Sequence, residues 1–227
     1  MNVAIIPARG GSQRIPRKNI KQFCGRSMIS YPIEAAIKSN YIDSVVVSTD
    51  DEEIAQISTQ FGAQIPFMRP KNISDNITPT VPVISHAITK LLDMGWEIDK
   101  ACCIYPCTPL LTSHLIDNIF DEMIKGDHMF AYPVILHSHP IQRAMKMKKD
   151  GKMDFLNKEH ELTRTQDLEP TFYDSGQFYW GQKKAWLNKQ KMHTDGIGVQ
   201  INSWEAVDID NDEDWEKAEM LIKSINK

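Results

Sequence analysis

Short apolar runs alternate with helix-like patterns along the first 136 residues. "VAII" at 3–6 and "SVVVS" at 44–48 are β-branched runs, typical of buried parallel strands. Between them, residues 28–39 carry apolar side chains at helical spacing. Apolar runs at 101–105 and 129–134 predict two more strands. This βαβ alternation predicts an open α/β sheet.

Three further helices are predicted between these strands. After "STD", the segment "DEEIAQISTQF" has Thr49 or Asp50 as a cap, acids in its first turn and an apolar stripe behind them. A turn-rich loop at 69–82 precedes a helix at about 83–94. Thr112 or Ser113 can cap a helix that runs to Lys125.

The pattern changes after His137. Residues 141–148 are strand-like and lead into Asp150-Gly151, a hairpin signal, and the chain stays polar and irregular to 176. "GQFYWG" at 176–181 and "WEAVDID" at 204–210 predict two strands, and a last helix at 212–225 has Asp212 as its cap. Without a repeat or linker, we predict one domain over 1–227 with an inserted arm at 137–170.

Composition is that of an ordinary soluble protein. The 227 residues are 41% hydrophobic and 25% charged, and no apolar run reaches membrane-spanning length. The opening residues lack a signal-peptide pattern, which predicts a cytoplasmic protein. The cysteines have no disulfide or CxxC spacing, so reduced buried thiols are expected. A pI near 6.0 argues against general nucleic-acid binding.

The charges are unevenly distributed. Residues 1–33 carry six cations and no acid, whereas 204–227 carry eight acids and three lysines. Charge runs of this kind are usually solvated surfaces. The alternative is that folding brings a polyanion site and a cation site together.

The opening loop, "ARGGSQRIPRKN" at 8–19, favours the second interpretation. It leaves the first predicted strand at its carboxyl end, where open α/β folds bind ligands. Gly10 and Gly11 let backbone N–H groups converge on an anion, and Arg9, Arg14 and Lys18 can neutralise phosphate oxygens. GxGxxG and GxxxxGK[ST] are both absent, so neither a dinucleotide fold nor a P-loop is supported.

Two carboxylates near the end of the chain predict a metal site. On a strand, Asp208 and Asp210 would point to one face. Mg²⁺ commonly takes one or two carboxylates together with substrate phosphates. The neighbouring acids 212–214 are better explained as the first turn of the last helix.

Several motifs together resemble one enzyme family. "IIPARGGSQRIPRKN", "VVVSTDDEEIA", "RP", "CTPLL" and "VDIDNDEDW" occur in the order and spacing of the cytidylyltransferases that activate nonulosonic acids, which include the CMP-sialic acid (acylneuraminate) synthetases. "TRTQDLEPTFYDSGQFYWG" at 163–181 is similar to the branch that uses pseudaminic acid. The sialate branch typically has Asn-Gly where this chain has Ser175-Gly176.

The resemblance implies a mostly parallel, mixed and twisted nucleotidyltransferase sheet, Rossmann-like and flanked by helices. The implied reaction transfers CMP from CTP to the anomeric hydroxyl of a nonulosonic acid, giving the CMP-sugar, CMP-pseudaminate, and pyrophosphate. Mg²⁺ or Mn²⁺ is the implied cofactor. The inserted arm is implied to contact a second copy, in a homodimer with a shared sugar pocket, and no nucleic acid or membrane is an expected partner.

Site residues follow by match to the family motifs. The implied nucleotide-binding residues are Ala8, Arg9, Gly10, Gly11, Ser12, Arg14, Lys18, Asn19, Arg69 and Asp75. The implied sugar-binding residues are Tyr105, Thr108, Arg164, Tyr173, Ser175 and Gln177, with Arg164 on the sugar carboxylate. Asp208 and Asp210 are implied metal ligands, and Arg9, Lys18, Asp208 and Asp210 the catalytic set. Gln13 stands where the motif commonly carries Lys, so Arg14 or Gln13 can be the residue that reaches the leaving phosphates.

Alternatives remain for the function. The nearest is the same reaction on sialic acid, legionaminic acid or deoxy-octulosonate. A Rossmann-type oxidoreductase would need the missing glycine fingerprint. A non-catalytic nucleotide-binding module would leave Asp208 and Asp210 without a purpose. The general base is open between a carboxylate and a metal-bound hydroxide, and no histidine is required.

Overall fold

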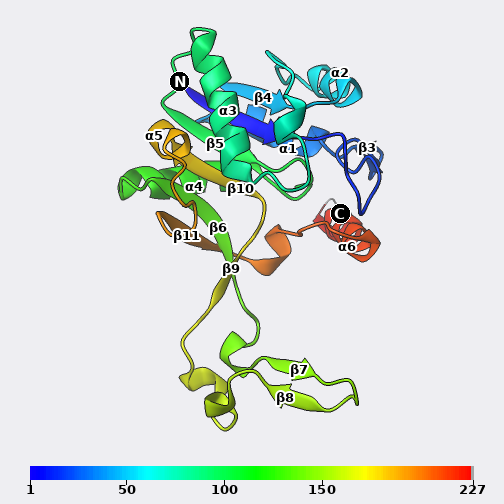
Figure 1. Ribbon diagram of the computed structural model, residues 1–227, viewed down its shortest axis with the longest axis vertical. Helices are drawn as coiled ribbons and strands as arrows, with labels where there is room; N and C mark the ends of the chain where they lie inside the picture. Colours follow the sequence, from blue (N-terminus) through cyan, green and yellow to red (C-terminus); the bar gives the residue numbers. More distant parts are fainter. Residues whose placement is uncertain (226–227) are drawn as a thin grey trace.

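The computed structural model describes residues 1–225, which form a mixed sheet flanked by helices (Figure 1). The strand order is β11-β6-β10-β5-β1-β4, and β9 also pairs with β6. The strands are β1 (Asn2–Pro7), β4 (Ser44–Ser48), β5 (Lys100–Ile104), β6 (Phe130–Leu136), β9 (Phe172–Asp174), β10 (Phe178–Gln182) and β11 (Gly196–Ile201). β1 is parallel to β4 and β5, and β11 is parallel to β6, whereas β10 runs antiparallel to both β5 and β6. The predicted fold class is confirmed.

The alternation of side chains along the strands divides the core between two faces. On β1, Ala4 and Ile6 face one cluster, while Val3 and Ile5 face the other. The first face is covered by α1 (Ser30–Ile37), α2 (Glu52–Gln60) and α4 (Ser113–Lys125). The second is covered by α3 (Thr80–Asp93) and α5 (Lys183–Leu187). Helices on both faces explain why these strands are apolar throughout.

A third apolar cluster fastens the end of the chain to its beginning. The last helix, α6 (Asp212–Ile225), packs Trp215 and Ala218 against Phe23 and Met28. Phe23 lies in the small ribbon of β2 (Gln22–Phe23) and β3 (Arg26–Ser27). The acidic end is thereby held next to the basic opening.

Helix caps agree with the predictions only in part. Thr112 caps α4 as predicted, by accepting a hydrogen bond from the backbone N–H of Leu115. α2 is capped by Asp51 instead of Thr49 or Asp50. Asp212 lies inside α6, and the side chain of Asn211 accepts from the N–H of Asp214 in its place. At each corrected position the capping side chain is one residue from the predicted one.

The segment between β6 and β9 extends away from the body (Figure 1). It contains a hairpin of β7 (Met145–Met147) and β8 (Met153–Phe155), turned at Gly151 with a positive φ of 81°. Short 3₁₀ turns flank the hairpin at Ile141–Arg143, Lys158–His160 and Thr165–Asp167. The predicted hairpin is therefore present, within a segment that extends from the sheet.

Two parts of the chain differ from the prediction. Residues 204–210 are not a strand: a 3₁₀ turn at Ser203–Glu205 leads into irregular chain. β11 was not predicted, because its two glycines weaken a strand pattern. A Cβ at Gly198 would lie 2.8 Å from a methyl group of Val134, so glycine permits the close approach of β11 and β6.

The loop predicted at 69–82 is shorter in the structure. It contains a 3₁₀ turn at Lys71–Ile73, and α3 begins at Thr80. No helix among the described residues has the length and apolarity needed to cross a bilayer.

Candidate active site

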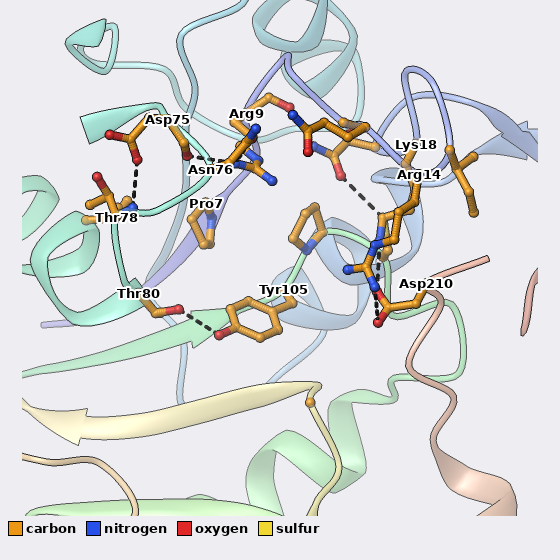
Figure 2. Close-up of a pocket in the computed structure, with 18 of the residues that line it drawn as sticks. Pro7, Arg9, Arg14, Lys18, Asp75, Asn76, Thr78, Thr80, Tyr105 and Asp210 are labelled. Carbon is orange, nitrogen blue, oxygen red and sulfur yellow. Dashed lines mark hydrogen bonds and ion pairs between the residues drawn. The ribbon is translucent and has the colours of Figure 1, made fainter. Parts of the chain in front are cut away.

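A cleft of about 650 Å³ opens at the carboxyl ends of β1 and β5 (Figure 2). Its walls come from five parts of the chain: the loop after β1, the loop before α3, the loop after β5, the turn between β9 and β10, and the segment between β11 and α6. The principal polar side chains lining it are Arg9, Ser12, Gln13, Arg14, Lys18, Asn19, Arg69, Asp75, Asn76, Thr78, Thr80, Tyr105, Asp208 and Asp210.

The basic and acidic ends of the chain meet in this cleft. Nη1 of Arg14 lies 2.6 Å from a carboxylate oxygen of Asp210. Nζ of Lys18 donates to the carbonyl of Ile209 at 2.6 Å and lies 3.9 Å from Asp210. Folding thus places cations and carboxylates side by side, as the second interpretation of the charge pattern expected.

Arg17, the remaining cation of the opening loop, does not line the cleft. It forms a two-point ion pair with the Asp51 carboxylate, at 2.5 and 3.0 Å, and also contacts Glu53. The hydrogen bond from Arg17 lowers the pKa of Asp51. Arg17 therefore fastens the loop to the start of α2.

Asp208 and Asp210 both line the cleft although no strand carries them. Ile209 between them is 1% exposed, so it anchors the segment while its neighbours face outward. Desolvation, followed by the negative charge of Asp210, raises the pKa of the Asp208 carboxyl. A divalent cation at this position would relieve that repulsion.

The donor set suits Mg²⁺ better than a metal that needs an all-protein cage. Among residues 1–225, no cluster of three or more His, Cys, Asp or Glu side chains is placed to hold a metal. Two hard carboxylates are available, and substrate phosphates and water can supply the other ligands of Mg²⁺.

Arg69 is a buried cation with unused hydrogen-bond donors. Its side chain is 4% exposed, and Nε and Nη2 have no hydrogen-bond partner among the described residues. Its nearest acid is Asp50, 3.8 Å from Nη2. Desolvation lowers the pKa of Arg69. Burying this charge costs free energy unless an anion accepts its unused hydrogen bonds. The cleft wall at Arg69 is therefore suited to a polar, negatively charged ligand.

Arg9 closes one side of the cleft. Its Nη1 donates to the carbonyl of Asp75 at 2.7 Å and to Oδ1 of Asn76 (Figure 2). The Asp75 carboxylate accepts from the N–H groups of Ile77 and Thr78, at 2.9 and 2.6 Å. Asp75 thus shapes its own loop, and Arg9 joins that loop to the opening one.

Three residues predicted to bind nucleotide do not line the cleft. Ala8 is buried and donates its N–H to the carbonyl of Ser48 at 3.0 Å. Gly10 donates to Asp50, and a Cβ there would lie 2.6 Å from the Asp51 carboxylate. Gly11 has no atom within 4 Å of such a Cβ. Ala8 and Gly10 position the opening loop from behind.

The predicted sugar-binding residues are more scattered. Tyr105 lines the cleft and shares a 2.7 Å hydrogen bond with Thr80. Thr108 is buried and donates to the carbonyl of Tyr105 at 2.9 Å. Ser175 and Gln177 are buried on either side of Gly176, which lines the cleft. Within residues 1–225 the Ser175 hydroxyl has no hydrogen-bond partner, and the side-chain amide of Gln177 donates to the carbonyl of Glu205.

Arg164 and Tyr173 lie outside the cleft. Arg164 is on the arm, 71% exposed, and pairs with Asp167 at 2.7 Å. Tyr173 lines a separate hollow at the base of the arm. The structure of one chain therefore does not bring these two residues to the other sugar-site candidates.

Sequence reasoning missed Asn76, Thr78 and Thr80 as cleft residues. They lie in "SDNITPT", where the turn-forming composition indicated a loop but not which side chains face inward. The hydrogen bond between Thr80 and Tyr105 depends on contacts between distant segments and leaves no local signal.

Comparison with known proteins agrees with this geometry. A family model described as cytidylyltransferase matches residues 3–224. The pseudaminic acid cytidylyltransferase of Campylobacter jejuni is 38% identical over 225 residues, covering 98% of this chain and 96% of the relative. The CMP-N,N'-diacetyllegionaminic acid synthase of Legionella pneumophila is 25% identical, covering 97% of this chain and 96% of the relative.

Solved structures share the fold. A CMP:2-keto-3-deoxy-manno-octonic acid synthetase complexed with CTP superimposes with a TM-score of 0.74 at 17% identity, with 98% of each chain covered. The sheet topology, the cleft and the match over nearly the whole chain lead to one conclusion: the chain belongs to the cytidylyltransferase family.

Proposed function

We propose that this enzyme transfers CMP from CTP to the anomeric hydroxyl of pseudaminic acid, a nonulosonic acid, and releases pyrophosphate. The observation that carries the proposal is the cleft itself, where the cationic loop after β1 faces Asp208 and Asp210. The identity of the acceptor is supported by the 38% identity to a pseudaminic acid cytidylyltransferase.

Charge is the central obstacle to this reaction, because both substrates are anions. Arg9, Arg14, Lys18 and Arg69 border the cleft and can neutralise phosphate oxygens. Asp208 and Asp210 would hold Mg²⁺, or Mn²⁺, which when bound withdraws charge from those oxygens. The cations then stabilise the negative charge that gathers on pyrophosphate as it leaves.

Arg14 has a specific place in this proposal. It contacts the Oδ2 atom of Asp210, and that oxygen becomes available to a metal when the contact opens. The Arg14 side chain is 67% exposed, so it is free to turn toward the phosphates. Gln13 lines the same part of the cleft but is neutral, so Arg14 is the neighbouring side chain that can neutralise phosphate charge.

The acceptor proton goes to an oxygen base. No histidine is among the described residues that line the cleft, so its carboxylates are the side chains able to accept a proton.

The acceptor preference can be tested with a grid of substrates. We expect pyrophosphate release with CTP and pseudaminic acid, and slow or no release with sialic acid, legionaminic acid or deoxy-octulosonate. ATP, GTP and UTP should be poor donors. Equal rates with sialic and pseudaminic acid would contradict the proposed acceptor, while no release in any combination would contradict the proposed reaction.

We further propose that residues 1–227 act as one domain whose arm, 137–170, contacts a second copy in a homodimer. The arm exposes apolar side chains that a monomer would leave in water. The most exposed are Met147 at 72%, Leu156 at 58% and Leu162 at 95%. In such a dimer, Arg164 of one copy would pair with the sugar carboxylate in the cleft of the other.

Mixed dimers test this shared site. Arg164→Ala and Asp208→Asn are each expected to be inactive alone, because each lacks one part of every site. When the two are co-expressed with different tags, about half of the dimers are mixed, and each mixed dimer has one site with both parts intact. About a quarter of wild-type activity should return in the total dimer pool. No recovery in purified mixed dimers, or a monomer by sedimentation velocity, would contradict the shared site.

A further inference from the structure

The turn after β4 places two carboxylates behind the opening loop. Asp51 caps α2 and is paired with Arg17 at 2.5 Å. The Oδ1 atom of Asp50 accepts from the backbone N–H of Gly10 at 3.0 Å. The same oxygen lies 3.8 Å from Nη2 of Arg69. One oxygen of Asp50 therefore faces both the opening loop and the buried guanidinium of the cleft wall.

Arg69 and Asp50 attract each other without forming a hydrogen bond. Their separation of 3.8 Å is longer than a hydrogen bond between a guanidinium and a carboxylate. The backbone of Arg69 is nevertheless fixed beside Asp50, because its N–H donates to the carbonyl of Thr49 at 2.7 Å. Within the described part of the chain, Nε and Nη2 of Arg69 donate to no acceptor. Arg69 can therefore bind a phosphate oxygen while Asp50 stays where it is.

Asp50 offsets positive charge at this wall without lining the cleft itself. Arg9 and Arg69 both line the cleft, whereas Asp50 lies behind them. Desolvation lowers the pKa of Arg69, the negative charge of Asp50 opposes that shift, and the positive charge of Arg9 adds to it. The two arginines therefore present less net positive charge to an anion in the cleft than they would without Asp50.

A site that binds one polyanion and must release another needs such a balance. Pyrophosphate keeps two of the three phosphoryl groups of CTP and gains negative charge where the bond is cleaved. Every cation that binds the triphosphate therefore also retains the product. Interactions that hold substrate and product equally well do not raise turnover, and slow product release limits many enzymes. A fixed carboxylate beside a buried guanidinium weakens its hold on any anion, which favours release.

We propose that Asp50 is a positioning residue that acts through Arg69. Its carboxylate holds the guanidinium at the cleft wall and limits the attraction of Arg69 for pyrophosphate, so that this product can leave. Asp50 itself touches neither substrate. This inference rests on the proposed reaction, since that reaction releases pyrophosphate.

Asp50→Asn and Asp50→Ser test the charge alone, because each keeps an oxygen that can accept from Gly10. In both variants we expect Kd for pyrophosphate, measured by calorimetry with Mg²⁺ present, to fall by about tenfold. Pyrophosphate should also dissociate more slowly in stopped-flow measurements. The Ki of cytidine, which carries no phosphate, should change by less than about twofold. Asp50→Glu restores the charge and should return Kd for pyrophosphate to within about threefold of the wild-type value.

Glu52→Gln is the matched control, since Glu52 is an exposed acid in the first turn of α2 and its removal changes the net charge equally. Pyrophosphate binding should not change in this variant. In an Arg69→Gln background, Asp50→Asn should cause no further tightening, because Asp50 acts through Arg69.

Unchanged or weaker pyrophosphate binding in the two charge-removing variants, or equal tightening of cytidine, would overturn the inference while leaving the proposed reaction standing. Tightening that persists without Arg69 would overturn it as well. No pyrophosphate release from CTP with any acid sugar by the unmodified protein would overturn the proposed function and this inference together.

Discussion

Asp208→Asn and Asp210→Asn are each expected to lower turnover by about a thousandfold or more. Asparagine keeps the shape of the side chain but removes the charge that would hold a divalent cation against the phosphates. Electrostatic stabilisation of leaving phosphate charge is worth several kcal/mol, and each 1.4 kcal/mol is about tenfold in rate. Pyrophosphate release at a series of Mg²⁺ concentrations measures the loss.

Two further measurements separate this effect from misfolding. Asp212→Asn is the matched control, because Asp212 is 88% exposed in the first turn of α6. It should keep near-normal activity. Mn²⁺ binding in the presence of CTP, followed by electron paramagnetic resonance, should weaken in the two site variants only. Full activity in either variant, or undiminished wild-type activity in EDTA, would refute the metal assignment.

Lys18→Ala is expected to lower kcat/KM by about 10- to 150-fold, because a charge-assisted hydrogen bond to phosphate contributes about 1.5–3 kcal/mol. The Lys18 side chain is 21% exposed, compared with 67% for Arg14. Its Nζ atom already donates to the Ile209 carbonyl. Its ammonium group is thus positioned between the opening loop and the carboxylates. Steady-state kinetics with CTP varied measures the effect.

Gln13→Ala is the comparison for Lys18. Gln13 lines the same cleft but carries no charge, so its removal should cost less than about fivefold. The loss of kcat/KM in Arg14→Gln should lie between those of Lys18→Ala and Gln13→Ala, since Arg14 is charged but largely exposed. Equal losses for Lys18→Ala and Gln13→Ala would show that Lys18 is not the principal cation.

The sequence predicted the elements whose signal is local. β1, β4 and α4 follow from β-branched runs and from a cap with an apolar stripe, and they lie where expected. β11 is held in the sheet by its fit against β6, where Gly198 meets Val134, and that contact has no local signal. Residues 207–210 alternate between buried and more exposed side chains as a strand would, but the sheet gives them no neighbour.

The same distinction applies to the site. The opening loop and the two carboxylates were located by their motifs and lie in one cleft. Arg17 belongs to the same basic motif, yet it pairs with Asp51, because the loop turns at Arg17 with a positive φ of 54°. Arg164 lies on the arm, outside the cleft, and its proposed contact with the sugar carboxylate requires a second copy of the chain. Spacing along one chain carries no information about that arrangement.

The two ends of the arm leave the sheet from directly paired residues, Leu136 on β6 and Phe172 on β9. Neighbouring strands of an antiparallel ladder are about 5 Å apart, a gap that a two-residue turn can close. The length and the sequence of the arm can therefore change without shifting the register of the strands beneath it. The arm could be exchanged between relatives, or excised, while the sheet beneath it keeps its strand order.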